Sequence, residues 1–210
     1  MGAPDPIYFQ LFPTIGKGEL RRLEIVRTAI NLIAKQGEDG VVFHHIAEKM
    51  KTRRSHIIYY FKERSELLET VLKYITATAQ AITVEEVKKA KTPREQLLAV
   101  SDGAFAWAEK HPEQARVMIY LYHVFATDSS FKKLHTVVRE VGVRRIGSLL
   151  RQAVGEKKVA PFTLEVMAKG IQTLTTGLLF EDFVISGNKS GREFCRQAIE
   201  QWIDGISGNS

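Results

Sequence analysis

The chain of 210 residues is long enough for one large domain or two small ones. Its apolar fraction of 44% is ordinary for a protein that buries a core, and its net charge of +6 is a mild excess of base. The single cysteine, Cys195, excludes an internal disulfide and a metal site built from cysteines.

Positive charge is concentrated near the N-terminus. Residues 1–64 contain 11 Lys or Arg against 7 Asp or Glu, and the remaining residues contain 19 against 17. This distribution favours a module that binds a polyanion, with a merely solvated basic face as the alternative. No apolar run approaches the roughly 18 residues of a membrane span, and no basic residue precedes Lys17 as in a secretory signal. We therefore expect a cytoplasmic protein that does not contact membrane.

The first part of the chain predicts an irregular arm followed by three helices. Residues 1–16 hold an apolar and aromatic run bracketed by Pro and Gly, which leaves packing on a neighbouring surface and disorder both open. A helical period begins at Glu19 and ends at Gly37, a residue that adopts the left-handed cap conformation without steric cost. Two short helices are expected over 43–50 and 53–61, with a tight turn between them.

The rest of the sequence predicts six further helices. Thr92 is expected to be the N-cap of the second of these and Pro93 its first residue. Asp128 or Ser129 is expected to cap the fourth, which Gly155 closes. The six are predicted over about 63–90, 93–111, 112–126, 130–154, 162–186 and 192–205. With about nine helices and no convincing strand, the predicted fold class is all-α, divided into a helix-turn-helix domain over 17–64 and a helical domain over 65–210.

The stretch from Ile46 to Phe61 predicts a DNA-binding helix pair. Its apolar residues would face inward: Ile46, Met50, Ile57 and Phe61. Its second helix would expose side chains that reach phosphates and base edges: Arg53, Arg54, Ser55, His56 and Tyr59. A helix of this kind suits the major groove of DNA, whose width admits one α-helix.

Several motifs with matching spacings agree with a known pattern. They are Arg21-Arg22, the run from Ala29 to Gly37, Ile46-Ala47-Glu48, Ile57-x-Tyr59-Tyr60-Phe61 and Leu67-Leu68. On these features residues 20–68 resemble the N-terminal domain of the tetracycline-repressor (TetR) family of bacterial transcription regulators. The downstream half is similar to the family in helix number and length.

The sequence departs from the family pattern at the turn and at the two helix starts. Lys51 stands where Gly is common, so it bears a steric cost if the turn needs a positive φ. Arg53 stands where a small hydroxyl residue caps the second helix, and Val42 stands where Thr or Ser caps the first. Ile58 replaces a frequent Tyr. These changes keep the core positions and add positive charge at the groove.

The resemblance implies that the helix from Arg53 to Tyr60 is the recognition helix. Arg53 and Arg54 can pair with phosphates or bidentately with guanine. The residues expected to contact DNA are His44, His45, Lys51, Thr52, Arg53, Arg54, Ser55, His56, Tyr59, Tyr60 and Lys62. Tyr60 has a purely core role as its alternative. Because His44 and His45 are adjacent, they lie about 100° apart on a helix and do not chelate a metal as a pair at i, i+4 would. We expect no metal site and no cofactor.

The resemblance also implies that the C-terminal domain binds a small effector and forms a homodimer. The candidate pocket residues combine large apolar groups with a few polar ones: Tyr74, Thr78, Phe105, Met118, Tyr122, His123, Phe125, His135, Gln172 and Thr176. Trp107, Met167 and Phe180 are further candidates, and ordinary core packing is the alternative for each residue. The last two helices, with Ile171, Leu174, Leu178, Ala198 and Trp202, are expected to supply the dimer interface.

Three functions remain open at this point. The first is a homodimeric regulator, expected to be a repressor that a small, largely apolar ligand releases from its operator. The second is an all-helical enzyme, against which stands the lack of a P-loop, a dinucleotide turn, His-Glu-x-x-His and Gly-x-Ser-x-Gly. The third is a protein-interaction module without DNA binding, which the cluster of Lys51, Arg53 and Arg54 disfavours. We expect the regulator and no enzymatic activity.

Overall fold

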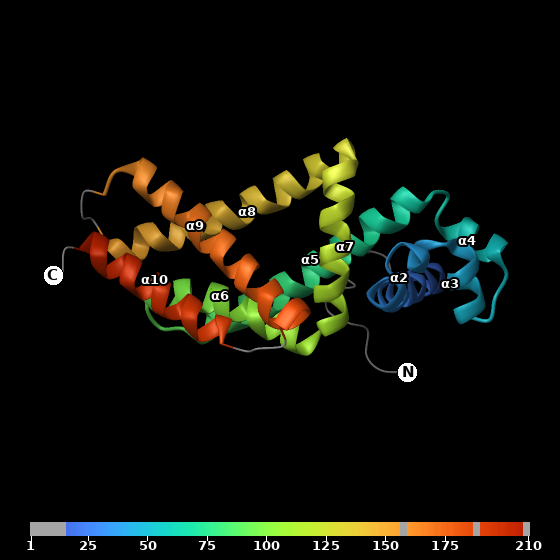
Figure 1. Ribbon diagram of the computed structural model, residues 1–210, viewed down its shortest axis with the longest axis horizontal. Coiled ribbons are helices and arrows are strands. Elements are labelled where there is room, and N and C mark those ends of the chain that lie inside the picture. Colours follow the sequence, from blue (N-terminus) through green and yellow to red (C-terminus); the bar gives the residue numbers. More distant parts are fainter. Residues whose placement is uncertain (1–15, 156–158, 187–189, 208–210) are drawn as a thin grey trace. The chain divides into compact units, whose positions relative to one another are not determined.

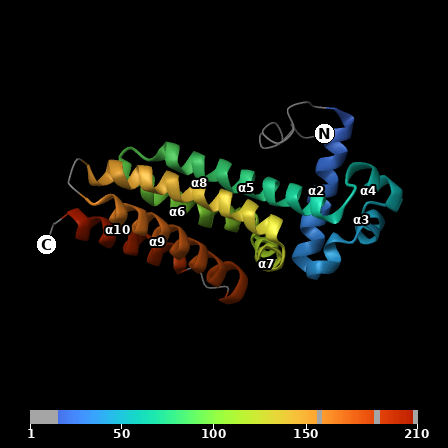
Figure 2. The same ribbon diagram turned by 90° about the horizontal axis from the view of Figure 1, so that it is seen from above.

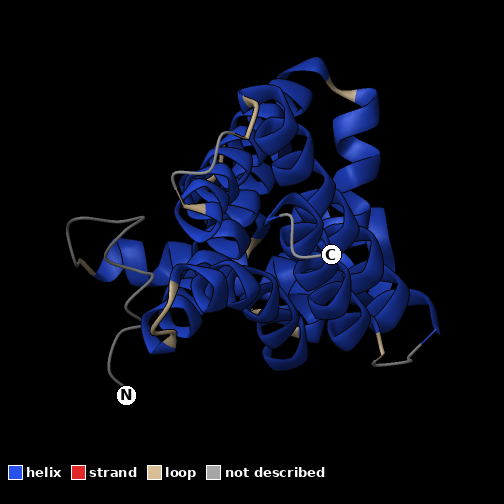
Figure 3. Ribbon diagram, turned by 90° about the vertical axis from the view of Figure 1, so that its left-hand side faces the viewer, coloured by secondary structure: helices blue, strands red, loops and turns tan. Residues whose placement is uncertain are grey.

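The computed structural model describes residues 16–155, 159–186 and 190–207, and all the regular structure in these residues is helical (Figure 3). The predicted arm over 1–16 lies outside the described residues except for Gly16. Contacts divide the described chain into two compact units. Unit 1 contains the residues up to Thr78 together with Glu113–Thr127, and unit 2 contains Ala79–Pro112 and the residues from Asp128 onward. The predicted domain over 17–64 lies within unit 1.

Unit 1 begins with helix α2 (Lys17–Gln36), which the sequence predicts to within a few residues. Gly37 caps it with a φ of +61° and donates its N–H to the carbonyl of Ile33, as predicted from its lack of a side chain. A short 3₁₀ helix, η1 (Gly37–Val41), follows and was not predicted. Gly40 lets η1 lie on the backbone of α2, because a Cβ there would collide with Ile33.

The remaining elements of unit 1 are two short helices, half of a long one, and a helix from later in the chain. Helices α3 (Phe43–Lys49) and α4 (Arg54–Tyr60) lie beside α2, and helix α5 (Arg64–Lys89) starts here and continues into unit 2 (Figure 1). Helix α7 (Pro112–Thr127) completes the unit. Arg64 of α5 connects α7 and η1 within unit 1. Its guanidinium donates to the Tyr120 hydroxyl of α7 at 2.6 Å and pairs with the Glu38 carboxylate of η1 at 2.8 Å.

Unit 2 is built from the second half of α5 and four further helices. They are α6 (Pro93–Lys110), α8 (Ser129–Val154), α9 (Pro161–Phe180) and α10 (Gly191–Ser207). Helices α8, α9 and α10 lie side by side in Figure 2, and α6 packs against all three. Both predicted caps form: Thr92 accepts the N–H of Glu95 at 3.2 Å, and Asp128 accepts those of Ser130 and Phe131.

The end of α9 differs from the sequence prediction. The α-helix expected to run to Ser186 stops at Phe180, and Glu181–Ser186 form a π-helical turn, η2. The buried carboxylate of Asp182 accepts the N–H of Gly191 at 2.8 Å, so this turn holds the start of α10. Apolar periodicity does not distinguish a single wider turn from the α-helix that precedes it. The described part of the chain contains no helix long and apolar enough to cross a membrane.

Polar groups tie α6 to α10 inside unit 2. The carboxylate of Asp102, which is 7% exposed, accepts hydrogen bonds from Arg192, at 2.9 Å, and from Arg196. Beside it, Ser101 lies 3.0 Å from the sulfur of the fully buried Cys195 and 3.2 Å from the Thr175 hydroxyl. Because buried polar groups are costly without partners, these contacts fix the register of the three helices.

Candidate nucleic-acid interface

The turn between α3 and α4 is a Schellman motif. The N–H of Thr52 donates to the carbonyl of Ala47 at 2.9 Å, and the N–H of Lys51 donates to that of Glu48 at 3.0 Å. This motif places the residue after the helix in the left-handed region. Lys51 accordingly has a φ of +51°. Among the described residues it is the single one other than glycine that has a positive φ. The condition on which the expected steric cost of Lys51 depends, a positive φ at the turn, is therefore met.

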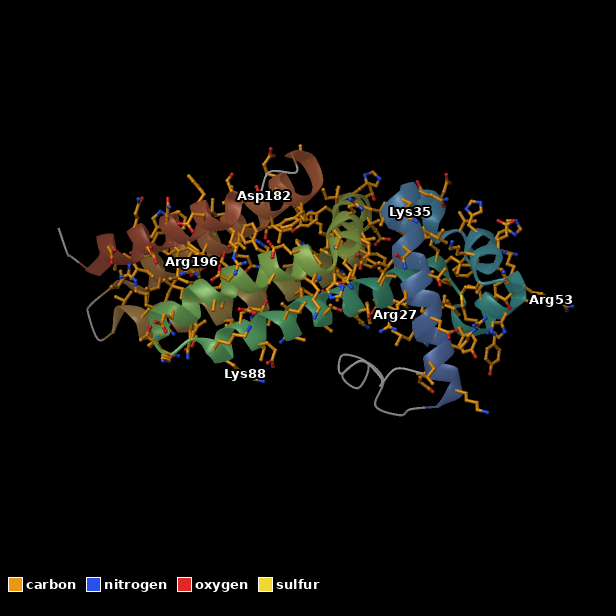
Figure 4. All side chains as sticks on the ribbon, turned by 90° about the horizontal axis from the view of Figure 1, so that it is seen from below. Arg27, Lys35, Arg53, Lys88, Asp182 and Arg196 are labelled. Atoms are coloured by element: carbon orange, nitrogen blue, oxygen red, sulfur yellow. The ribbon has the colours of Figure 1, made fainter. Side chains whose placement is uncertain are left out.

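Helix α4 buries one face and exposes the other. Ile57 and Phe61 are fully buried, whereas Arg53, Arg54 and Ser55 are exposed. Arg53 projects away from the tip of the helix pair in Figure 4. The N-caps of α3 and α4 are Val42 and Arg53, and neither side chain makes a capping hydrogen bond, as the sequence predicts.

Six residues of the turn and of α4 line one shallow depression of about 540 Å³. They are Lys51, Thr52, Arg53, Ser55, His56 and Tyr59. All six are among the residues expected to contact DNA, and the set contains two permanent cations and no carboxylate. We call this surface the α4 depression. Its cations, hydroxyls and imidazole are the groups that bind phosphate oxygens and base edges.

Helix α2 orients the side chains of α4, a role that the sequence analysis missed. Arg21 directs its Nε at the Nε2 of His56 at 3.4 Å, and the His56 ring meets Tyr60 edge to face. If Nε2 accepts this hydrogen bond, the neutral ring carries its proton on Nδ1, which is left to donate. The guanidinium of Arg22 lies 4.5 Å from the centre of the Phe61 ring and bonds Glu66.

The other predicted DNA contacts do not line the α4 depression. His44 is exposed and lies 3.6 Å from the Glu48 carboxylate, while Nδ1 of His45 contacts the Asp39 carbonyl at 2.9 Å. His45 lines a separate depression that also contains Asp39 and Glu48, whose charge would repel a phosphate. Arg54 at the start of α4 and Lys62 just after its end are exposed, and Tyr60 is half-buried.

The predicted effector residues are divided between the two units. Tyr74, Thr78, Met118, Tyr122, His123 and Phe125 belong to unit 1, and Phe105, His135, Gln172 and Thr176 belong to unit 2. Tyr122 and Phe125 pack edge to face, with ring centres 5.5 Å apart. Thr78 is buried and its hydroxyl donates to the carbonyl of Tyr74, whose own hydroxyl accepts from Arg27 at 3.2 Å.

Unit 2 holds a groove of about 1030 Å³ between α8 and α9, which we call the α8–α9 groove. Its lining consists of His135, Thr136, Arg139, Glu140, Val143, Arg144, Gly147, Ser148, Arg151, Leu164, Glu165, Ala168 and Lys169. His135 alone of these was a predicted effector residue. Burial, and then the neighbouring Arg139, lower the pKa of His135 below its ordinary value. The signal in the sequence for this surface was the presence of Arg139, Arg144 and Arg151 within one predicted helix.

Two other predicted polar residues, Gln172 and Thr176 of α9, do not line this groove. The amide of Gln172 packs where Gly142 leaves room, since a Cβ there would lie 2.8 Å from its Oε1. That oxygen is buried and has no hydrogen-bond partner among the described residues. Thr176 donates its hydroxyl to the carbonyl of Gln172.

Comparisons with known proteins agree with this geometry. No protein-family model matches the sequence. The HTH-type transcriptional regulator BetI of Burkholderia ambifaria is 22% identical over 176 residues, which cover 83% of this chain and 88% of the relative. A TetR-family regulator structure from Rhodococcus sp. superposes with a TM-score of 0.70 at 21% identity, covering 90% of this chain and 98% of that one.

A second solved structure is a putative transcriptional regulator from Saccharomonospora viridis in complex with choline. It superposes with a TM-score of 0.73 at 20% identity and covers 88% of this chain and 96% of that one. The likeness extends through both the helix-turn-helix and the helices that follow it. These comparisons show that the chain has the fold of the solved TetR-family transcriptional regulators.

Proposed function

We propose that the protein is a homodimeric repressor that binds a duplex operator through α4 and is released from it by a small effector. The observation that carries the DNA contact is the α4 depression, which joins Lys51, Arg53 and the Tyr59 hydroxyl without any acidic group. Arg54 extends this basic surface on the next exposed position of α4. A helix presented in this way fits the major groove, with its N-terminal residues toward the bases.

The dimer is supported by an apolar face on α9 and α10. Phe162 and Val166 of α9 are 76% and 51% exposed, and Phe194 and Trp202 of α10 are 57% and 38% exposed. Gly170 lets the Trp202 ring approach α9, because a Cβ there would lie 3.3 Å from the ring. Of the residues expected at this interface, Ile171 is buried in its own chain and Trp202 is partly exposed, so Phe162, Val166 and Phe194 join Trp202 in this proposal. Pairing these faces between two copies would remove them from water and present two recognition helices to a palindromic operator.

The effector is the third part of the proposal. The regulator from S. viridis holds choline, which supports the capacity of this fold to bind a small molecule. A ligand releases the operator only if it binds the released state more tightly than the DNA-bound state, and couplings of about 1–3 kcal/mol are typical.

DNA binding is tested by selecting duplexes from a random pool with the purified protein and then measuring affinity at several salt concentrations. We expect a palindromic sequence to be enriched. The double substitution Arg53→Ala, Arg54→Ala should weaken its binding by about 1–3 kcal/mol if a base contact is lost, or lower the salt slope by about one for each lost phosphate contact. The control, Lys132→Ala with Lys133→Ala, removes two exposed cations of α8. Equal affinity and slope in the two double variants would refute the assignment of α4.

The dimer is tested by sedimentation of Phe194→Glu and of Ile185→Glu. Both substitutions place a charge at an exposed apolar residue, but Ile185 lies outside the proposed face. We expect Phe194→Glu to sediment as a monomer at micromolar concentration and Ile185→Glu as a dimer. A dimer in both variants would place the subunit interface on other helices.

A further inference from the structure

We infer that the α8–α9 groove binds an anionic amphiphile, a molecule with a single negative group and an apolar chain, and that this is the effector class of the regulator. The inference rests on the proposed release of the protein from DNA by a small molecule. Two observations support it: the rim of the groove has an excess of positive charge, and apolar side chains lie beneath that rim.

The rim of the groove has an excess of positive charge. Four permanent cations line it, Arg139, Arg144, Arg151 and Lys169, against the two carboxylates of Glu140 and Glu165. Each carboxylate already has a partner: Glu165 bonds Lys169 at 2.5 Å, and Glu140 lies 3.8 Å from Arg144.

Arg139 and Arg151 are therefore the cations that remain for a ligand. Among the described residues, Arg139 bonds the neutral hydroxyl of Thr173 at 3.3 Å, and neither Arg139 nor Arg151 makes an ion pair. Guanidinium groups of this kind bind a carboxylate or a phosphate with two parallel hydrogen bonds.

Apolar side chains lie beneath this rim. Leu164 and Ala168 of α9 are 7% and 1% exposed and line the groove, and Ala168 lies next to Gly147 of α8. Val143 adds a half-buried apolar surface one turn away. A Cβ at Gly147 would lie 3.8 Å from the Cβ of Ala168, so α8 and α9 are near neighbours at this floor. An apolar chain placed here would lose contact with water, while its charged end reached the rim.

The length of the groove sets the size of the ligand. Arg139 and Arg151 are twelve residues apart on one helix, which corresponds to about 18 Å. A chain of about a dozen carbons spans most of that distance with its charged end at either arginine. The same charge pattern disfavours a cation such as choline in this groove, because Arg139 and Arg151 would repel it.

The test compares three ligands with matched chains on the full-length protein. Dodecanoate, dodecyltrimethylammonium and dodecanol are titrated calorimetrically below their aggregation limits. We expect dodecanoate to bind at least about tenfold more tightly than either of the others, the ratio expected when one charge-assisted contact is made or lost. Equal binding of the cationic and anionic chains would overturn the inference.

Two double variants locate the site. Arg139→Gln with Arg151→Gln removes the free cations of the groove, and Lys132→Gln with Lys133→Gln removes two cations of α8 that do not line it. Both pairs are exposed, so both variants should fold as the wild type does. The groove variant should lose dodecanoate affinity by about tenfold or more, and the control should keep it. Unchanged affinity in the groove variant would overturn the assignment.

Measuring release of the selected duplex by dodecanoate distinguishes failure of this inference from failure of the proposed function. Dodecanoate should release the selected duplex from the wild type and the control, but not from the groove variant at the same concentration. If the ligand-free protein binds its duplex and dodecanoate does not release it, the inference is wrong and the DNA-binding function stands. If no duplex is enriched at all, the proposed function itself fails. Dissociation of the homodimer by dodecanoate would assign the groove to the subunit interface and overturn the inference.

Discussion

The left-handed backbone at Lys51 offers the sharpest test of the helix-turn-helix geometry. A residue with a Cβ bears a cost of about 1–2 kcal/mol in this region, and Lys51 has a φ of +51°. Lys51→Gly removes that cost. It also gives the unfolded chain more conformational freedom, which offsets about 0.4–1 kcal/mol of the gain. We therefore expect a net stabilisation of about 0.5–1 kcal/mol, or roughly 2–3 °C in the midpoint of thermal unfolding.

Lys51→Ala is the matched control, because it removes the same charge but keeps the Cβ that causes the strain. Its stability should equal that of the wild type or fall slightly below it. On DNA, both variants should reduce the slope of log affinity against log salt by about 0.9 if Lys51 neutralises one phosphate. Urea unfolding and salt titrations of the three proteins separate the two effects. A glycine variant no more stable than the alanine variant would refute the proposed strain.

Three further predictions concern a helix cap, a buried charge and a titration. Val42→Thr should stabilise α3 by about 0.5–1 kcal/mol in urea unfolding, because the uncapped position already has the extended backbone that a cap needs, whereas Val42→Ala should not. Asp102→Asn should destabilise the protein by about 1–3 kcal/mol, since Arg192 and Arg196 lose their shared carboxylate; melting at the wild-type temperature would contradict this. Because the pKa of His135 is lowered in the folded protein, the imidazole takes up a proton more readily in the unfolded chain. The free energy of unfolding should therefore fall as the pH drops below 6.5, and the contribution of His135 should be fully present above that pH. His135→Gln should lose less stability than the wild type between about pH 7.5 and about pH 5.5, as measured by urea unfolding.

The sequence by itself determined the helices and most of their ends. Gly37, Thr92 and Asp128 stop or start helices as predicted, because each acts through hydrogen bonds or backbone freedom within a single turn. The positive φ at Lys51 and the missing side-chain cap at Arg53 were predicted in the same way, because both depend on residues within a single turn. The proposal that α4 faces DNA also needed no tertiary information: the period of its apolar residues predicted that Ile57 and Phe61 face inward, and both are buried.

The tertiary structure alone decided which distant side chains meet and which apolar stripes remain exposed. Arg21 reaches His56 across thirty-five residues of sequence, a contact that no local spacing announces. Ile171 and Phe194 are both apolar residues of the last helices, yet the first is buried and the second exposed. Burial of a helical residue depends on which neighbour covers its face, and that choice is made by the packing of the whole unit. The α8–α9 groove exists for the same reason: its three arginines belong to α8, but the buried Leu164 and Ala168 beneath them belong to α9.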